Sequence, residues 1–156
     1  QLVLGHLTPL QPVQLLGKAI LIVDPDVRSL DWMQRVLSAC GASVMSFCSV
    51  DNAICYLADG SKLPTIVISG PGMSRSEERQ LIMSIRQQLG LSAHQLPAIA
   101  FSSAREMEGV RPYWLYMYQA RLSACPSEIQ ILGATHRLIT SHSVNSPLDS
   151  GIAGPA

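Results

Sequence analysis

The stretch that most constrains the fold is a short apolar run in the middle of the chain, Thr65 to Ser69, with the sequence TIVIS. Pro64 precedes the run and Gly70 follows it, so it is too short for a buried helix, and its isoleucine and valine side chains are typical of β-strands. A strand that is apolar on both faces belongs in the middle of a parallel sheet that helices cover on both sides. The sequence therefore predicts such a central strand at residues 65–69.

Other apolar runs recur along the chain and alternate with helical patterns. The further strands that these runs predict are Ala19–Asp24, Ser43–Cys48, Pro97–Phe101 and Ala120–Ala124. Apolar residues at three- and four-residue spacing predict helices at Asp26–Cys40, Asp51–Leu57, Ser76–Leu89 and Ser127–Ile139. Strands and helices that alternate at this interval indicate an α/β fold with a parallel sheet.

The ends of the first two helices carry recognisable signals. Asp26 and Asp51 are the expected N-caps, because a carboxylate can accept hydrogen bonds from the free N–H groups of a first turn. Gly41 and Gly60 are expected to end these helices, where a left-handed backbone is favoured.

The helical pattern weakens before the last predicted strand. Gly109 and Pro112 interrupt the expected fourth helix, so we expect two short pieces instead of one rod. The aromatic side chains of the chain concentrate here, at Tyr113, Trp114, Tyr116 and Tyr118. These rings either pack on the sheet or form an exposed binding patch, and the sequence leaves both possibilities open.

Both ends of the chain lack an apolar period. Residues 1–17 are interrupted by Gly5, Pro9 and Pro12 and contain no Lys or Arg, which argues against a signal peptide or a membrane span and predicts a linker. Ser, Asn, Pro and Gly become common from Thr140 on, so residues 142–156 are expected to form a disordered tail. One domain is therefore predicted at residues 18–141.

The charge balance argues against several classes of partner. The 156 residues include 11 basic (Lys and Arg) and 11 acidic ones, so no net field favours nucleic acid or an anionic membrane. Charged residues make up 14% of the chain, below the usual share of about 25%. A surface this poor in charge is either merely neutral or covered by a partner.

The cysteines and histidines indicate neither a disulfide framework nor a metal site. The cysteines, which form no C-x-x-C pair, are Cys40, Cys48, Cys55 and Cys125. We expect them to be buried thiols of a protein in a reducing, cytoplasmic setting. The histidines are scattered, without the spacing of zinc ligands. The sequence predicts no bound metal and no cofactor.

Three segments carry a resemblance to a known family. ILIVDPDVRSL, LPTIVISGPGM and LPAIAFSSA resemble the first, third and fourth strands, with their loops, of the receiver domain of bacterial response regulators. The resemblance covers roughly Lys18 to Ile139. It implies a flavodoxin-like (βα)5 fold, a doubly wound parallel sheet with the strand order 2-1-3-4-5.

The resemblance also implies a set of functional positions. A working receiver has an acidic pair after strand one that holds Mg²⁺, an aspartate after strand three that accepts the phosphoryl group, a Ser or Thr after strand four, and a lysine after strand five. Asp24 matches the first acid. Pro25 stands at the second, with Asp26 one residue late.

The remaining positions depart further from the family's pattern. The acceptor position falls on Gly70, which has no side chain. The lysine position falls on Cys125, or on Ala124 with a shift of one residue, and neither supplies a cation. Ser102 alone matches cleanly.

These losses make the chain resemble a pseudo-receiver. Domains of this kind occur in cyanobacterial hybrid kinases, including circadian clock-input kinases, where the fold is kept as a protein-binding module. The resemblance implies a signalling or clock protein, or a tethered histidine kinase domain, as the partner, and no catalysis. Trp, Tyr and Arg dominate binding hot spots, so the candidate partner-binding residues are Arg111, Tyr113, Trp114, Tyr116 and Arg121.

Two alternatives stay open at this point. The first is an active receiver that is phosphorylated on Asp24 or Asp26. The second is a flavodoxin-like cofactor binder, which would share the sheet order and bring the loop from Ser69 to Gly72 close to a phosphate. The acidic loop after strand one argues against the second alternative, because it would repel a phosphate.

Overall fold

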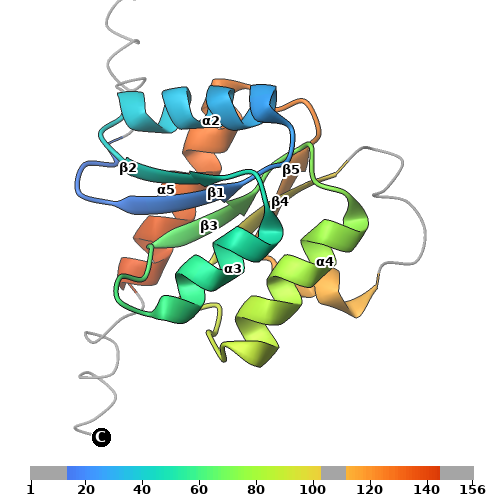
Figure 1. Cartoon of the computed structure of the whole chain (residues 1–156). Helices are drawn as coiled ribbons and strands as arrows, with labels where there is room; N and C mark the ends of the chain where they lie inside the picture. Colours follow the sequence, from blue (N-terminus) through green and yellow to red (C-terminus); the bar gives the residue numbers. More distant parts are fainter. Residues whose placement is uncertain (1–13, 103–111, 145–156) are drawn as a thin grey trace, which may run out of the picture.

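A five-stranded parallel sheet organises the computed structural model of the protein, which describes residues 14–102 and 112–144 (Figure 1). The strands are β1 (Ala19–Val23), β2 (Ser43–Phe47), β3 (Ile66–Ser69), β4 (Ala98–Ser102) and β5 (Ala120–Ser123). Their order in the sheet is β2-β1-β3-β4-β5, and every neighbouring pair is parallel. The predicted flavodoxin-like order with β3 in the middle is confirmed.

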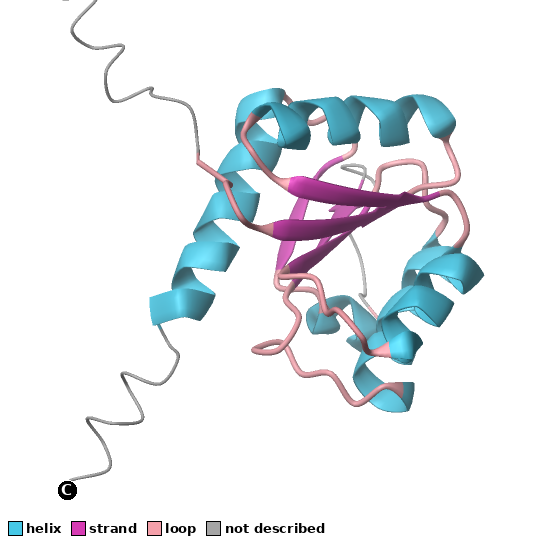
Figure 2. Ribbon diagram, turned by 60° about the vertical axis from the view of Figure 1, so that its left-hand side comes forward, coloured by secondary structure: helices cyan, strands magenta, loops and turns pink. Residues whose placement is uncertain are grey.

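Helices cover both faces of the sheet, as Figures 1 and 2 show. One face carries α2 (Val27–Ala39) and α5 (Glu128–Val144). The other carries α3 (Val50–Asp59), α4 (Arg75–Met83), the π-helix η2 (Ser84–Gln88) and the 3₁₀-helix η4 (Tyr113–Met117). Within the described ranges, no helix is long and apolar enough to span a membrane.

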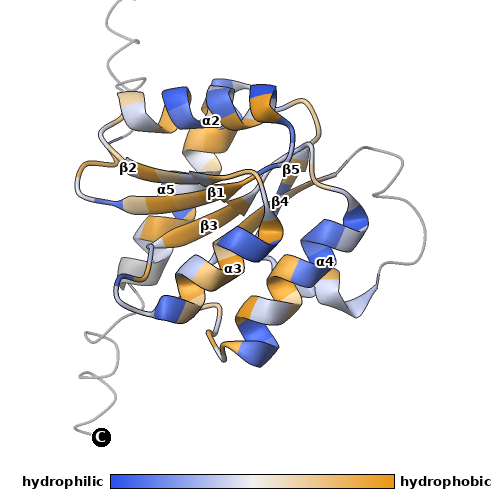
Figure 3. Cartoon of the chain, in the orientation of Figure 1, coloured by the Kyte–Doolittle hydropathy of each residue, from blue (hydrophilic) through white to orange (hydrophobic). Residues whose placement is uncertain are grey.

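The strand β1 shows how the sequence builds two cores. Side chains alternate along a strand, so Ile20 and Ile22 pack under α2 and α5, whereas Leu21 and Val23 pack under α3 and α4. All four are completely buried. Figure 3 shows the same pattern, with apolar strands inside and hydrophilic residues on the outer surfaces of the helices.

The helix ends follow the predicted signals with one exception. The carboxylate of Asp26 caps α2, and Gly41 and Gly60 have the left-handed φ values of +96° and +70° that such helix ends favour. The exception is α3, where the hydroxyl of Ser49 caps the helix instead of Asp51. Asp51 lies in the first turn, where its charge still favours the positive end of the helix dipole.

The domain boundaries extend beyond the predicted ones at both ends. Leu15, which was expected in the linker, is buried against α2 and α5, and its N–H donates to the carbonyl of Cys40 at 2.9 Å. The helix α5 continues past Ile139 to Val144, because no glycine or proline interrupts it there. Residues 142–144 are therefore helical and not part of a disordered tail. The expected linker residues 1–13 and tail residues 145–156 lie outside the described residues.

The expected burial of the thiols is wrong. Cys48, Cys55 and Cys125 are exposed, and Cys40 is half-buried. Cys48 and Cys125 lie in the loops that follow β2 and β5, and Cys55 lies on the outer side of α3. The free state of all four thiols agrees with the absence of a disulfide pattern.

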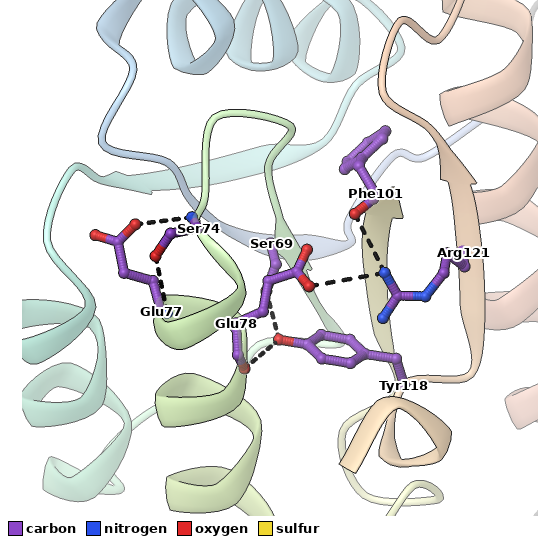
Figure 4. Close-up of polar contacts among 7 residues, drawn as sticks. All are labelled: Ser69, Ser74, Glu77, Glu78, Phe101, Tyr118 and Arg121. Carbon is purple, nitrogen blue, oxygen red and sulfur yellow. Dashed lines mark hydrogen bonds and ion pairs between the residues drawn. The ribbon is translucent and has the colours of Figure 1, made fainter. Parts of the chain in front are cut away.

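The predicted helix at residues 76–89 is divided into α4 and the wider turn η2. Ser74 and Glu77 begin α4 with reciprocal hydrogen bonds between side chain and backbone (Figure 4). The guanidinium of Arg86 in η2 is half-buried, and burial lowers its pKa. It donates hydrogen bonds to the carbonyls of Leu96 (2.8 Å) and Met117 (3.0 Å), so it ties the loop before β4 to the segment before β5.

Replacing Arg86 by methionine should strongly destabilise the fold. The variant keeps an apolar stem but leaves several carbonyl groups without their charged donor, which should lower the free energy of unfolding by about 2–4 kcal/mol. Urea unfolding followed by circular dichroism measures the change. Arg79→Met is the matched control, because Arg79 is exposed on α4 and should change the free energy by less than about 0.5 kcal/mol. Equal effects of the two substitutions would contradict a structural role of Arg86.

Candidate functional site

The loops after β1 and β3 meet at the carboxyl edge of the sheet, where open α/β folds place their ligands. Val23 and Ser69, the last residues of the two strands, are in register, and the N–H of Gly70 donates to the carbonyl of Val23 at 2.8 Å. This pairing brings Asp24 and Gly70 side by side. Two of the predicted site residues are therefore neighbours although 46 positions separate them in the numbering.

The carboxylate of Asp24 is fully buried and joins the two loops. Its Oδ1 accepts a hydrogen bond from the N–H of Asp26 at 2.8 Å, and its Oδ2 accepts one from the N–H of Gly72 at 3.1 Å. Burial raises the pKa of Asp24 above its ordinary value, and repulsion by Asp26 and Glu77 adds to the shift, while the two N–H groups partly offset it. The buried carboxylate of Asp24 therefore connects the loops after β1 and β3 through hydrogen bonds.

The two glycines of the β3 loop are required by this arrangement. A methyl group on Gly70 would collide with Oδ2 of Asp24 and lie 2.7 Å from Cε of Met33. A methyl group on Gly72 would collide with Oδ1 of Asp24. The position that resembles a phosphoryl acceptor therefore lacks a carboxylate and also lacks the space for one, because Asp24 fills it.

The acids present do not fit the magnesium ion that a working receiver holds. Asp26 uses both carboxylate oxygens in its cap, where they accept hydrogen bonds from the N–H of Arg28 and the hydroxyl of Ser29, each at 3.1 Å. Asp24 is buried and holds two N–H groups, and Gly70 offers no side-chain ligand. Within residues 14–102 and 112–144, no cluster of three or more His, Cys, Asp or Glu side chains could hold a metal.

The carboxyl edge also offers few hydrogen-bond donors to a phosphate-bearing cofactor. Backbone N–H groups are what a glycine-rich loop offers to a phosphate. Here the N–H of Gly72 already donates to Asp24. The negative charge of that carboxylate would also repel a phosphate, so the geometry disfavours the flavodoxin-like alternative.

The other two predicted site residues lie further along the same edge. Ser102 ends β4 and is in register with Ser123 of β5. Cys125 follows β5 in an exposed loop. A thiol at this place supplies no cation for a transferred phosphoryl group.

A buried network beside the site was not predicted from the sequence (Figure 4). The hydroxyl of Tyr118 donates to the backbone carbonyl of Glu78 at 2.8 Å, and its oxygen lies 2.8 Å from Oγ of Ser69. A phenol has one proton to donate, so Ser69 is the donor to Tyr118. Arg121 adds an ion pair to Oε1 of Glu78 at 3.7 Å and a hydrogen bond to the carbonyl of Phe101 at 3.2 Å.

This network fixes α4 on the sheet and leaves Ser69 chemically inert. Burial is the main cause that raises the pKa of Tyr118, so its hydroxyl stays protonated and cannot act as a base for Ser69. The sequence did contain one indication of this network, the hydroxyl of Ser69 at the end of an apolar strand, because a buried hydroxyl needs a hydrogen-bond partner. The partner lies 49 positions away, and the sequence does not identify it.

The predicted partner-binding residues divide into two groups. Tyr113 and Tyr116 are 60% and 69% exposed, and they share one face of η4 because a 3₁₀-helix repeats every three residues. Trp114 is buried, and only 13% of the Arg121 side chain is exposed, so neither offers the contact surface that was expected. Arg111 lies outside the described residues.

The sequence matches no protein-family model and no curated protein. Solved structures are similar in fold. The N-terminal domain of a response regulator/sensory box/GGDEF three-domain protein from Carboxydothermus hydrogenoformans is 16% identical with a TM-score of 0.66, over 83% of this chain and 100% of that one. A response regulator receiver domain protein from Clostridium thermocellum is 13% identical with a TM-score of 0.68, over 81% and 98% of the two chains.

A third similar structure is a response regulator receiver protein from Burkholderia phymatum. It is 21% identical with a TM-score of 0.62, over 80% of this chain and 96% of that one. Identities this low show the fold alone. The chain has the fold of response regulator receiver domains. At its carboxyl edge the buried Asp24 lies against Gly70, the position that resembles the acceptor.

The buried carboxylate of Asp24 should make the stability of the protein depend on pH. Because its pKa is raised in the folded state, the folded protein binds the proton more tightly than the unfolded chain. At a pH below 3.8, the ordinary pKa, the carboxyl group is protonated in both states and burying it costs no charge. At a pH above the raised pKa of the folded state, the full free-energy cost of burying the charged carboxylate applies. The free energy of unfolding of Asp24→Asn, minus that of the wild type, should therefore increase as the pH rises through this window.

Urea unfolding at a series of pH values, in buffer free of divalent metal, measures this difference. Asp31→Asn is the matched control, because Asp31 is exposed and pairs with Arg35. Its difference from the wild type should not increase over the same window. A difference for Asp24→Asn that falls with rising pH would contradict the assigned environment of Asp24.

Proposed function

We propose that the protein is a pseudo-receiver, a signalling module that is not phosphorylated and acts by protein–protein contact in a two-component or phosphorelay pathway. The observation that carries the proposal is the position of Asp24, whose carboxylate occupies the space of the missing acceptor at Gly70. The module has no catalytic role. The receiver fold of similar structures supports a role in signalling.

The chemistry of phosphoryl transfer supports the same proposal. The reaction needs an accessible carboxylate, a metal ion and a cation to balance the charge of the transferred group. Asp24 is buried, Asp26 caps a helix, and the residue at the lysine position is Cys125. Each requirement fails independently, so no single substitution should restore the reaction.

The proposed contact surface lies on η4. Tyr113 and Tyr116 form the exposed side of η4, which packs against α4. The hydroxyl of Tyr113 lies 3.8 Å from the sulfur of Met83, and the buried Tyr118 anchors the end of this segment to β3 and α4. We therefore assign the contact surface to Tyr113 and Tyr116, two exposed aromatic side chains of a type that is common in binding hot spots.

The partner is a signalling protein or a tethered histidine kinase domain. One similar structure is a domain of a three-domain protein, which supports a tethered arrangement. The resemblance to pseudo-receivers of cyanobacterial hybrid kinases supports circadian clock input as the pathway. Four free thiols suit a reducing compartment such as the cytoplasm.

Incubation with acetyl phosphate and Mg²⁺ should leave the protein unmodified. The wild type and Gly70→Asp should both retain their intact mass, because Asp24 blocks the acceptor position and no cation stands at Cys125. Intact-mass spectrometry is the measurement, with an active receiver domain in the same buffer as the positive control. A phosphoryl group gained by the wild type and located on Asp24 or Asp26 would establish the active-receiver alternative.

The contact surface is testable with a photo-crosslinking amino acid. Benzoylphenylalanine placed at Tyr113 or Tyr116 should form adducts with a kinase or another signalling protein in cells of the native host. The same amino acid at Arg35, which is exposed on α2, should form none. Mass spectrometry identifies the adducts. Adducts at Arg35, or none at the two tyrosine positions, would assign the contact to another surface.

A further inference from the structure

A cavity opens at the amino-terminal edge of the sheet, at the opposite ends of the strands from Asp24. Its volume is about 540 Å³, and the residues that line it come from the starts of β1, β2 and β3, from α3 and from the loop between α3 and β3. Pockets for small molecules usually measure about 300–1,000 Å³. The cavity thus has the size of a ligand site, and neither the receiver fold nor the proposed contact surface makes use of it.

The floor of the cavity is fixed by hydrogen bonds between strands. The N–H of Thr65 donates to the carbonyl of Ala19 at 2.7 Å, and the N–H of Ser43 donates to the carbonyl of Lys18 at 2.8 Å. These bonds hold the starts of three neighbouring strands in one arrangement. A ligand would therefore not have to order the floor in order to bind.

One wall of the cavity is apolar and equally fixed. The ring of Tyr56 packs against Phe47 with 5.5 Å between the ring centroids, and its hydroxyl donates to the sulfur of Met45 at 2.7 Å. Leu63 and Pro64 add apolar surface from the loop before β3. This wall suits the flat or aliphatic body of an organic molecule.

The polar groups of the cavity are a cation and two hydroxyls. Lys62 lines the cavity and has no ion pair within the part of the chain described. Ser43 and Thr65 also line the cavity, and both are at least partly exposed to solvent. Asp59, an acid nearby in the chain, does not line the cavity and accepts a hydrogen bond from Ser61.

Both lysines of the chain lie at or next to this cavity. The chain contains only two, Lys18 and Lys62. Lys62 lines the cavity, and Lys18 lies between the lining residues Gly17 and Ala19. Among the residues that line the cavity, Lys62 carries a charge and none is an aspartate or glutamate, which favours an anion.

We propose that the cavity binds a small organic anion, in which one acidic group is joined to an apolar body the size of one to three rings. The acidic group meets Lys62 and the two hydroxyls, and the apolar body lies against Tyr56, Met45 and Leu63. This site is separate from the carboxyl edge and does not depend on the function proposed above.

A pair of fluorescent probes tests the proposal on the full chain. The anion 8-anilinonaphthalene-1-sulfonate carries the predicted acidic group, and N-phenyl-1-naphthylamine has the same rings without it. The sulfonate should bind to one saturable site and should shift the amide NMR signals of Ser43, Tyr56 and Thr65. Lys62→Gln should weaken sulfonate binding about fivefold, which corresponds to about 1 kcal/mol, and should change binding of the uncharged probe less than twofold.

Two further variants keep the test specific. Arg35→Gln removes an exposed cation from α2 and should leave binding of both probes unchanged. Ser43→Phe adds a ring at the cavity, at an exposed position of β2 where folding should not suffer, and should abolish binding of both. Non-saturable sulfonate binding, NMR shifts confined to other surfaces, or an equal effect of Lys62→Gln on both probes would overturn the proposal.

Discussion

The contact on which the site depends is the pair of hydrogen bonds from the N–H groups of Asp26 and Gly72 to the carboxylate of Asp24. A buried carboxylate is costly unless it is hydrogen-bonded, and these two bonds are what keep it in place. The carboxylate can come this close to the β3 loop because Gly70 and Gly72 have no side chains. One interaction therefore joins the loops after β1 and β3 and fills the space beside Gly70 and Gly72.

The second constraint is the buried chain of polar groups from Ser69 through Tyr118 to Glu78 and Arg121. Buried hydrogen bonds and ion pairs connect the elements that they join, and this network joins β3, α4 and β5. In this structure the contacts of Tyr118 and Arg121 hold α4 against the central strand and connect it to β5.

The two edges of the sheet differ in character although the same strands form both. At the carboxyl edge, the polar groups bond to one another, so Asp24, Ser69 and Tyr118 have their partners within the protein. At the amino edge, Lys62, Ser43 and Thr65 line a cavity and are at least partly exposed to solvent. Polar groups that bond to one another stabilise the fold, whereas polar groups exposed at a cavity are available to a ligand.

The resemblance of three segments to receiver domains implied the strand order and the positions, Gly70 and Cys125, that lack an acceptor and a lysine. The sequence by itself determined the alternation of strands and helices, because apolar periodicity is a local property of the chain. It determined the cap at Asp26 and the helix ends at Gly41 and Gly60 for the same reason. Only the tertiary structure decided that Asp24 fills the space above Gly70, that Leu15 belongs to the core, and that Trp114 and Arg121 lie inside while Tyr113 and Tyr116 lie outside. These outcomes depend on contacts between residues far apart in the chain, and the local pattern of a segment does not show which distant side chain it will meet.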